Sequence, residues 1–129
     1  MMVAVALVFA GLAALVHVYI FVMESLTWTS AKTRAVFGTT LQEAEATKEM
    51  AFNQGFYNLF LAIVTAVGIA LLAGSADAAG TALVLAGTGS MAAAAILLFV
   101  TSPDKRGAAL KQGVVPLLAA AALVIGSLA

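Results

Sequence analysis

The chain has 129 residues, of which 64% are hydrophobic and only 9% charged, and its six basic and six acidic side chains cancel to a net charge of zero. A soluble domain averages roughly 45–50% apolar and about 25% charged residues, so these few charges cannot cover a water-soluble globule of this size. The composition therefore excludes a water-soluble enzyme, a nucleic-acid-binding domain and a disordered tail, and it predicts one domain embedded in a lipid bilayer.

Four segments are long and apolar enough to cross a bilayer, which requires roughly 20 mostly apolar residues in a row. No basic residue precedes Glu24, so we expect the first segment to be a retained helix rather than a cleaved signal peptide. Hydrocarbon satisfies no backbone N–H or C=O group, so each segment must be a helix. The sequence predicts an all-α, four-helix transmembrane bundle that forms a single domain over residues 1–129. Its spans cover about residues 2–23, 53–73, 79–100 and 110–128.

The segment between the first two spans is the only long polar stretch, and it is predicted to be partly helical. Thr29-Ser30 can cap a short helix that ends at Phe37-Gly38. The run Thr40-Leu41-Gln42-Glu43 fits a capping box, and nothing between Leu41 and Phe52 breaks a helix. We therefore expect the second span to extend out of the membrane, with a charged face that meets water or lipid headgroups.

The basic side chains all lie on one side of the predicted bundle. Three lie between spans one and two, and three at the loop between spans three and four, whereas the other loop and both termini have none. Cytoplasmic loops carry an excess of Lys and Arg. We therefore expect a cytoplasmic connecting helix and both termini outside the cytoplasm. The six residues are Lys32, Arg34, Lys48, Lys105, Arg106 and Lys111.

Small residues recur at every fourth position of span three. Such a ladder lets helix backbones approach closely in lipid, so we interpret it as a packing face, with Gly87 and Gly89 marking a kink or a close contact. The ladder consists of Ala78, Ala82, Ala86, Ser90 and Ala94.

Polar side chains within the spans gather in their cytoplasmic third, although burying polar groups in lipid costs free energy. At 1.5 Å per residue, His17 lies about 10 Å deeper than Glu24, and Asn58 lies about 8 Å deeper than Asn53. Each residue alone is more typical of helix packing or of an interfacial belt, but a set at matched depth favours a shared pocket that opens to the cytoplasm. The candidates are His17 and Glu24 as an acid/base pair, and Trp28, Asn53, Gln54, Tyr57, Asn58 and Gln112 as ligand-binding residues.

Several runs also match the pattern of a known family: His17-Val18-Tyr19-Ile20, Glu24, Trp28, Phe37-Gly38, residues 53–58, Phe60-Leu61-Ala62, Gln112-Gly113 and Pro116. The most specific is Asn-Gln-Gly-Phe-Tyr-Asn at residues 53–58. In these runs the chain resembles a bacterial family of small four-span membrane proteins called domain of unknown function thirteen-hundred-and-four. The resemblance implies a four-span fold and a multi-pass location in the bacterial cytoplasmic membrane, and it implies no activity.

Three functions fit these observations. The first is a membrane protein that binds or chemically transforms a small lipophilic molecule, with His17 and Glu24 exchanging protons. The second is a small oligomeric proton-coupled transporter, and the third is a structural subunit of a membrane complex. Whether the protein is an enzyme or a homo-oligomer stays open. One histidine and no cysteine predict no metal site and no cofactor.

Overall fold

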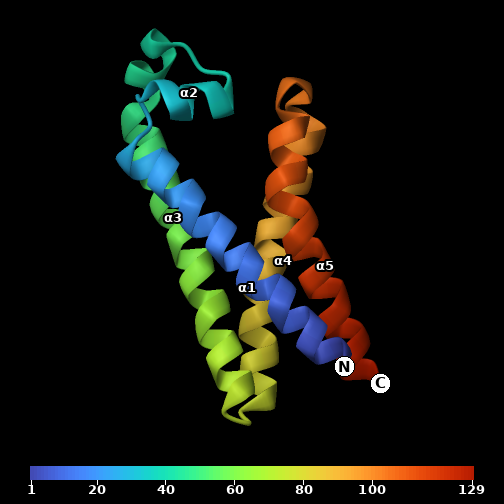
Figure 1. The fold of residues 1–129 in the computed structure, drawn as a ribbon. Coiled ribbons are helices and arrows are strands. Elements are labelled where there is room, and N and C mark those ends of the chain that lie inside the picture. The colour runs from blue at the N-terminus through green and yellow to red at the C-terminus, as the bar shows by residue number, and fades with distance from the viewer.

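The computed structural model describes all of residues 1–129, and every element in it is a helix (Figure 1). Four of the helices are long and apolar enough to cross a membrane, which confirms the predicted all-α architecture and identifies the chain as a multi-pass membrane protein. In chain order the elements are α1 (Met2–Phe21), the π-helix η1 (Val22–Leu26), α2 (Ala31–Phe37), α3 (Leu41–Ala73), α4 (Asp77–Thr101), the 3-10 helix η2 (Pro103–Lys105) and α5 (Arg106–Leu128).

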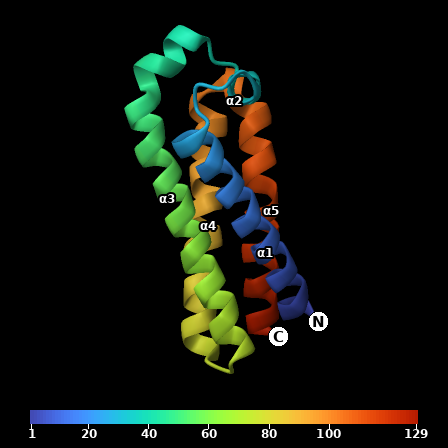
Figure 2. The ribbon, with the colours of Figure 1, turned by 60° about the vertical axis from the view of Figure 1, so that its left-hand side comes forward.

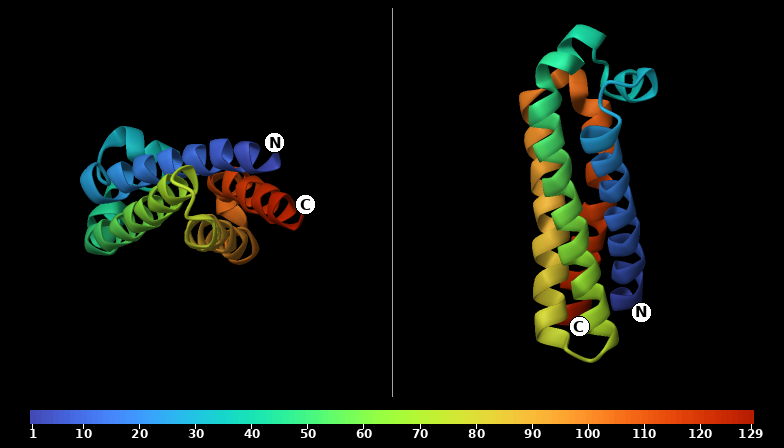
Figure 3. Two further views of the ribbon diagram at one scale, coloured as in Figure 1. Left: turned by 90° about the horizontal axis from the view of Figure 1, so that it is seen from below. Right: turned by 90° about the vertical axis from the view of Figure 1, so that its left-hand side faces the viewer.

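The four long helices form a ring. Helix α1 packs against α3 and α5, and α4 packs against the same two helices, so that α1 and α4 lie on a diagonal (Figure 3, left). Helix α2 lies at one end of the bundle, which we call the α2 end. Both termini and the α3–α4 turn lie at the other end, which we call the terminal end (Figures 1 and 2).

Small side chains bring the helices together near the terminal end. The buried cluster there is mostly alanine: Ala6, Ala10, Val84, Ala119, Ala122 and Leu123. The α3 and α4 backbones touch at two glycines, because a Cβ atom on Gly68 would lie 2.7 Å from the Val84 nitrogen and one on Gly80 would lie 2.7 Å from the Leu72 nitrogen. Small residues allow this close approach, and in lipid the helices associate through van der Waals packing rather than through the hydrophobic effect.

The prediction that the ladder of small residues on α4 is a packing face is wrong within this chain. All five residues of the ladder from Ala78 to Ala94 are exposed on the outside of the bundle. The buried face of α4 instead includes Gly80, Val84, Gly87 and Met91. The alanine spacing could not distinguish these faces, because small residues occur on both of them. The close contact expected at Gly87 is confirmed, since a Cβ atom there would overlap the Thr65 hydroxyl, whereas one on Gly89 would meet nothing within 4 Å.

The connecting segment folds as its capping signals predict. The Ser30 hydroxyl accepts a hydrogen bond from the Thr33 N–H at the start of α2, and Gly38 ends this helix with a φ of 66°. The Thr40 hydroxyl accepts from the Glu43 N–H at 3.1 Å, and the Glu43 carboxylate accepts from the Thr40 N–H at 2.9 Å. With this capping box in place, α3 continues for 33 residues without interruption.

Candidate functional site

A π-helical turn ends the first span, a feature that the sequence analysis did not predict. In η1 the Thr27 N–H donates to the Val22 carbonyl at 3.0 Å, five residues back. Single π-turns are rare and often occur at functional sites. The turn widens the helix where it meets Gly55 of α3. A Cβ atom on Gly55 would lie 3.0 Å from the Ser25 nitrogen and 3.1 Å from the Glu24 Cβ, so the two segments touch backbone to backbone.

Two side-chain hydrogen bonds hold η1 against α3. The Ser25 hydroxyl donates to the Phe52 carbonyl at 2.8 Å. The Asn58 amide donates to Oε2 of Glu24 at 2.8 Å and to the Gln54 carbonyl at 3.2 Å. Because Asn58 is itself fixed to its own helix, it sets the orientation of the half-buried Glu24 carboxylate.

The Trp28 side chain is fixed between α2 and α3. Its indole N–H donates to the Thr47 hydroxyl at 3.1 Å, and that hydroxyl donates in turn to the Glu43 carbonyl at 2.7 Å. The Trp28 ring also meets the Phe37 ring edge-on, with 5.0 Å between centroids. The indole N–H is therefore already used within the protein.

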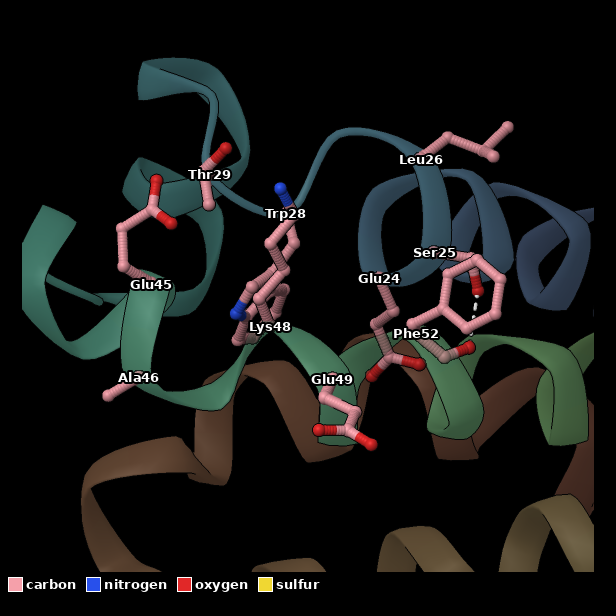
Figure 4. Close-up of a pocket in the computed structure, with 10 residues that line it drawn as sticks. All are labelled: Glu24, Ser25, Leu26, Trp28, Thr29, Glu45, Ala46, Lys48, Glu49 and Phe52. Carbon is pink, nitrogen blue, oxygen red and sulfur yellow. Dashed lines mark hydrogen bonds between the residues drawn. The ribbon is translucent and has the colours of Figure 1, made fainter.

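A cavity of about 510 Å³ lies between η1, the segment that follows it and α3. This volume falls in the range of roughly 300–1,000 Å³ that is typical of small-molecule sites. The close-up shows Trp28 between Glu24 and Glu45 (Figure 4). No three acidic or histidine side chains are grouped so that they could hold a metal ion. The lining residues are Glu24, Ser25, Leu26, Trp28, Thr29, Glu45, Ala46, Lys48, Glu49 and Phe52.

Three of the predicted site residues come together in this region. Glu24 and Trp28 line the cavity, and Asn58 contacts Glu24 from α3. Two other amide residues of the run at residues 53–58 do not line the cavity. Asn53 and Gln54 are exposed, and the Asn53 amide donates to the Glu49 carbonyl of its own helix. Trp28, Asn53, Gln54 and Asn58 are four of the six residues that the sequence predicted to bind a ligand.

The remaining predicted residues lie outside the cavity. Tyr57 is 66% exposed and packs against the Phe60 ring. His17 is only 3% exposed, and its Nδ1–H donates to the Ala13 carbonyl one turn earlier in α1. Gln112 is half-buried on α5. The structure thus brings the carboxylate, the indole and one amide together, and it brings neither the imidazole nor the α5 amide into the cavity.

Eight of the ten residues that line the cavity were missed by sequence reasoning, and five of these belong to the start of α3. Glu45, Lys48 and Glu49 are exposed, as expected for a charged extension, but they also face η1 across the cavity. One signal could have identified this wall. Residues 45, 48, 49 and 52 recur at the three- and four-residue spacing of one helix face, directly before the conspicuous run at 53–58.

Comparison with known proteins identifies a family but no function. The sequence model of a family described as "Protein of unknown function (DUF1304)" matches residues 11–124, a range that includes the whole cavity. No curated protein and no solved structure matches the chain.

Proposed function

The chain belongs to the DUF1304 family, and we propose that this integral membrane protein binds a small lipophilic molecule in the cavity between η1 and α3. The observation that carries the proposal is the cavity of about 510 Å³, whose wall combines apolar groups with the oriented Glu24 carboxylate. Four of the ten lining residues are apolar, and polar groups among apolar ones orient the ligand in small-molecule sites. We assign ligand contact to Glu24 and Trp28, and the positioning of Glu24 to Asn58.

Binding is a better proposal than catalysis. An acid/base mechanism would need both partners within reach of one substrate. Glu24 lines the cavity, whereas His17 is buried elsewhere in α1 and donates to its own backbone. A receptor, carrier or sensor of a lipophilic compound needs only the cavity and the groups that fix η1 beside α3.

We further propose that the α2 end faces the cytoplasm of a bacterial cell, which would place both termini on the opposite side of the cytoplasmic membrane. The support is the position of the basic residues, which all belong to α2, the start of α3, η2 and the start of α5. These segments lie together at the α2 end (Figure 1). An excess of Lys and Arg in the short loops on one side marks that side as cytoplasmic.

Single-cysteine labelling tests this orientation, because the natural chain has no cysteine. Ala35→Cys lies on the exposed side of α2, and Gly74→Cys lies at the exposed α3–α4 turn. In intact cells, a membrane-impermeant maleimide is expected to label Gly74→Cys, and to label Ala35→Cys only after the membrane is permeabilised. The reverse pattern would contradict the proposed orientation.

Tryptophan fluorescence tests ligand binding, because Trp28 is the only tryptophan and lines the cavity. In phosphatidylcholine nanodiscs, at least one of three ten-carbon probes (decanol, decyltrimethylammonium or decyl sulfate) is expected to shift the Trp28 emission saturably. A matched reporter is Trp28→Phe combined with Leu110→Trp, which moves the indole to an exposed position on α5. It should respond only in proportion to probe partitioning. Failure of all three probes to produce a saturable Trp28 response would rule out the proposed function.

A further inference from the structure

We propose that the ligand of this cavity is an amphiphile with a cationic head group, such as an amine or a quaternary ammonium. This inference rests on the proposed function, and it names the chemical class that the cavity selects. The cavity combines an aromatic wall with a net negative charge.

The charge of the cavity wall is negative on balance. Glu24, Glu45 and Glu49 contribute three carboxylates, and Lys48 contributes the single basic group. An anionic head group would be repelled at this wall, and a neutral head group would gain little from the second and third carboxylates. A cation interacts favourably with all three.

Of the three carboxylates, Glu24 is the one that can bind a cationic head group in preference to dissolved salt ions. It belongs to η1 rather than to the exposed face of α3, and it is half-buried. Its hydrogen-bond donor in the chain is the neutral Asn58 amide, which binds Oε2. Oε1 has no donor within the protein, so a cationic head group would supply the missing charge partner. An amine head group would donate a charge-assisted hydrogen bond to Oε1, roughly twice as strong as a neutral one, whereas a quaternary ammonium would be attracted by charge alone.

The Trp28 indole supplies a second, independent preference for a cation. Its N–H is already donated to Thr47, so Trp28 lines the cavity with its aromatic ring rather than with a free donor. Tryptophan is the best aromatic partner for ammonium groups. Leu26 and Phe52 complete the wall with apolar surface, which suits the hydrocarbon part of an amphiphile.

The test compares decyltrimethylammonium with decanol and decyl sulfate by Trp28 emission in phosphatidylcholine nanodiscs, each corrected for the amount of probe partitioned into lipid. We expect the cation to half-saturate at a concentration about tenfold below that of decanol, as aromatic and carboxylate contacts together would give. Decyl sulfate should be the weakest of the three. Equal half-saturation for the cation and decanol would overturn this inference, although the proposed binding function would stand.

Matched variants identify the cause of the preference. Glu24→Gln keeps an oxygen acceptor for Asn58 and removes the charge, so the half-saturating concentration of the cation is expected to rise and its advantage over decanol to fall to about threefold. Asp104→Asn removes a charge at the same end but outside the cavity, and it should change neither value. Glu49→Gln, on an exposed position, should lower the preference to a smaller extent, and it serves if Glu24→Gln does not fold. An undiminished preference in the folded Glu variants would overturn the inference.

Discussion

Replacing Gly80 by valine is expected to destabilise the bundle more than any other single substitution considered for this chain. A Cβ atom at this position would lie 2.7 Å from the Leu72 nitrogen and 2.9 Å from the Gly68 carbonyl oxygen. These are backbone atoms, which cannot move aside unless α3 and α4 separate. Overpacking of a close contact typically costs 1–3 kcal/mol, so we expect a loss of about 3 kcal/mol in the free energy of unfolding, measured by denaturant titration in detergent micelles.

Gly89→Val is the matched control for this prediction. It introduces the same side chain into the same helix, where a Cβ atom meets nothing within 4 Å. Because valine is a slightly better helix former than glycine, this variant should unfold at the same denaturant concentration as the natural protein or a little above it. Equal destabilisation by the two variants would show that α3 and α4 do not touch at Gly80.

Replacing Gly55 by valine is expected to displace η1 from α3 and thereby remove the cavity. The new side chain would collide with the Ser25 backbone nitrogen and with the Glu24 Cβ. We expect a loss of about 2 kcal/mol in the free energy of unfolding, together with loss of the saturable Trp28 response to decyltrimethylammonium. Gly80→Val in mild detergent, if it folds, should retain that response, because its contact lies near the other end of α3.

A double-variant experiment distinguishes a local collision from general damage to the helix. In Gly55→Ala the added methyl group would meet the Ser25 hydroxyl most closely, whereas in the natural chain that hydroxyl donates to the Phe52 carbonyl. Ser25→Ala should therefore cost less stability in the Gly55→Ala chain than in the natural chain. Gly11→Val, on a face of α1 where a Cβ meets nothing within 4 Å, should be neutral. If Ser25→Ala costs the same stability in both chains, the packing of η1 on Gly55 described above is incorrect.

The sequence was sufficient to predict the α-helices of this fold. In lipid, backbone hydrogen bonding allows only helices over long apolar segments, so the four spans followed directly from composition. Capping is equally local, and Ser30, Gly38 and the Thr40–Glu43 pair each mark a helix end correctly. These features depend on residues within one turn of each other.

The faces of the helices were harder to predict, because they depend on which partner each helix meets. Alanine is so frequent in α4 that the exposed ladder from Ala78 to Ala94 has the same spacing as the buried face around Val84. The glycines that decide the packing, Gly68 and Gly80, lie on two different helices. Their importance emerges only when the helices are placed side by side.

The candidate site was predicted in part, for a related reason. Depth along a helix axis follows from residue counting, but direction around the axis requires the helix to keep its regular period. Glu24 lies within the π-turn at Val22–Leu26, where the regular period that would place it on the face of His17 ends. Glu24 reaches Asn58 and the cavity, and His17 does not.

The length of α3 has a consequence for how any ligand would reach the protein. At 1.5 Å per residue, its 33 residues extend about 50 Å, whereas the hydrocarbon core of a bilayer is only about 30 Å thick. The cavity adjoins the first three turns of this helix, which places it at the boundary between lipid and water. A ligand there would be supplied by diffusion in two dimensions within the leaflet, so occupancy would follow its mole fraction among lipids rather than its concentration in the aqueous phase.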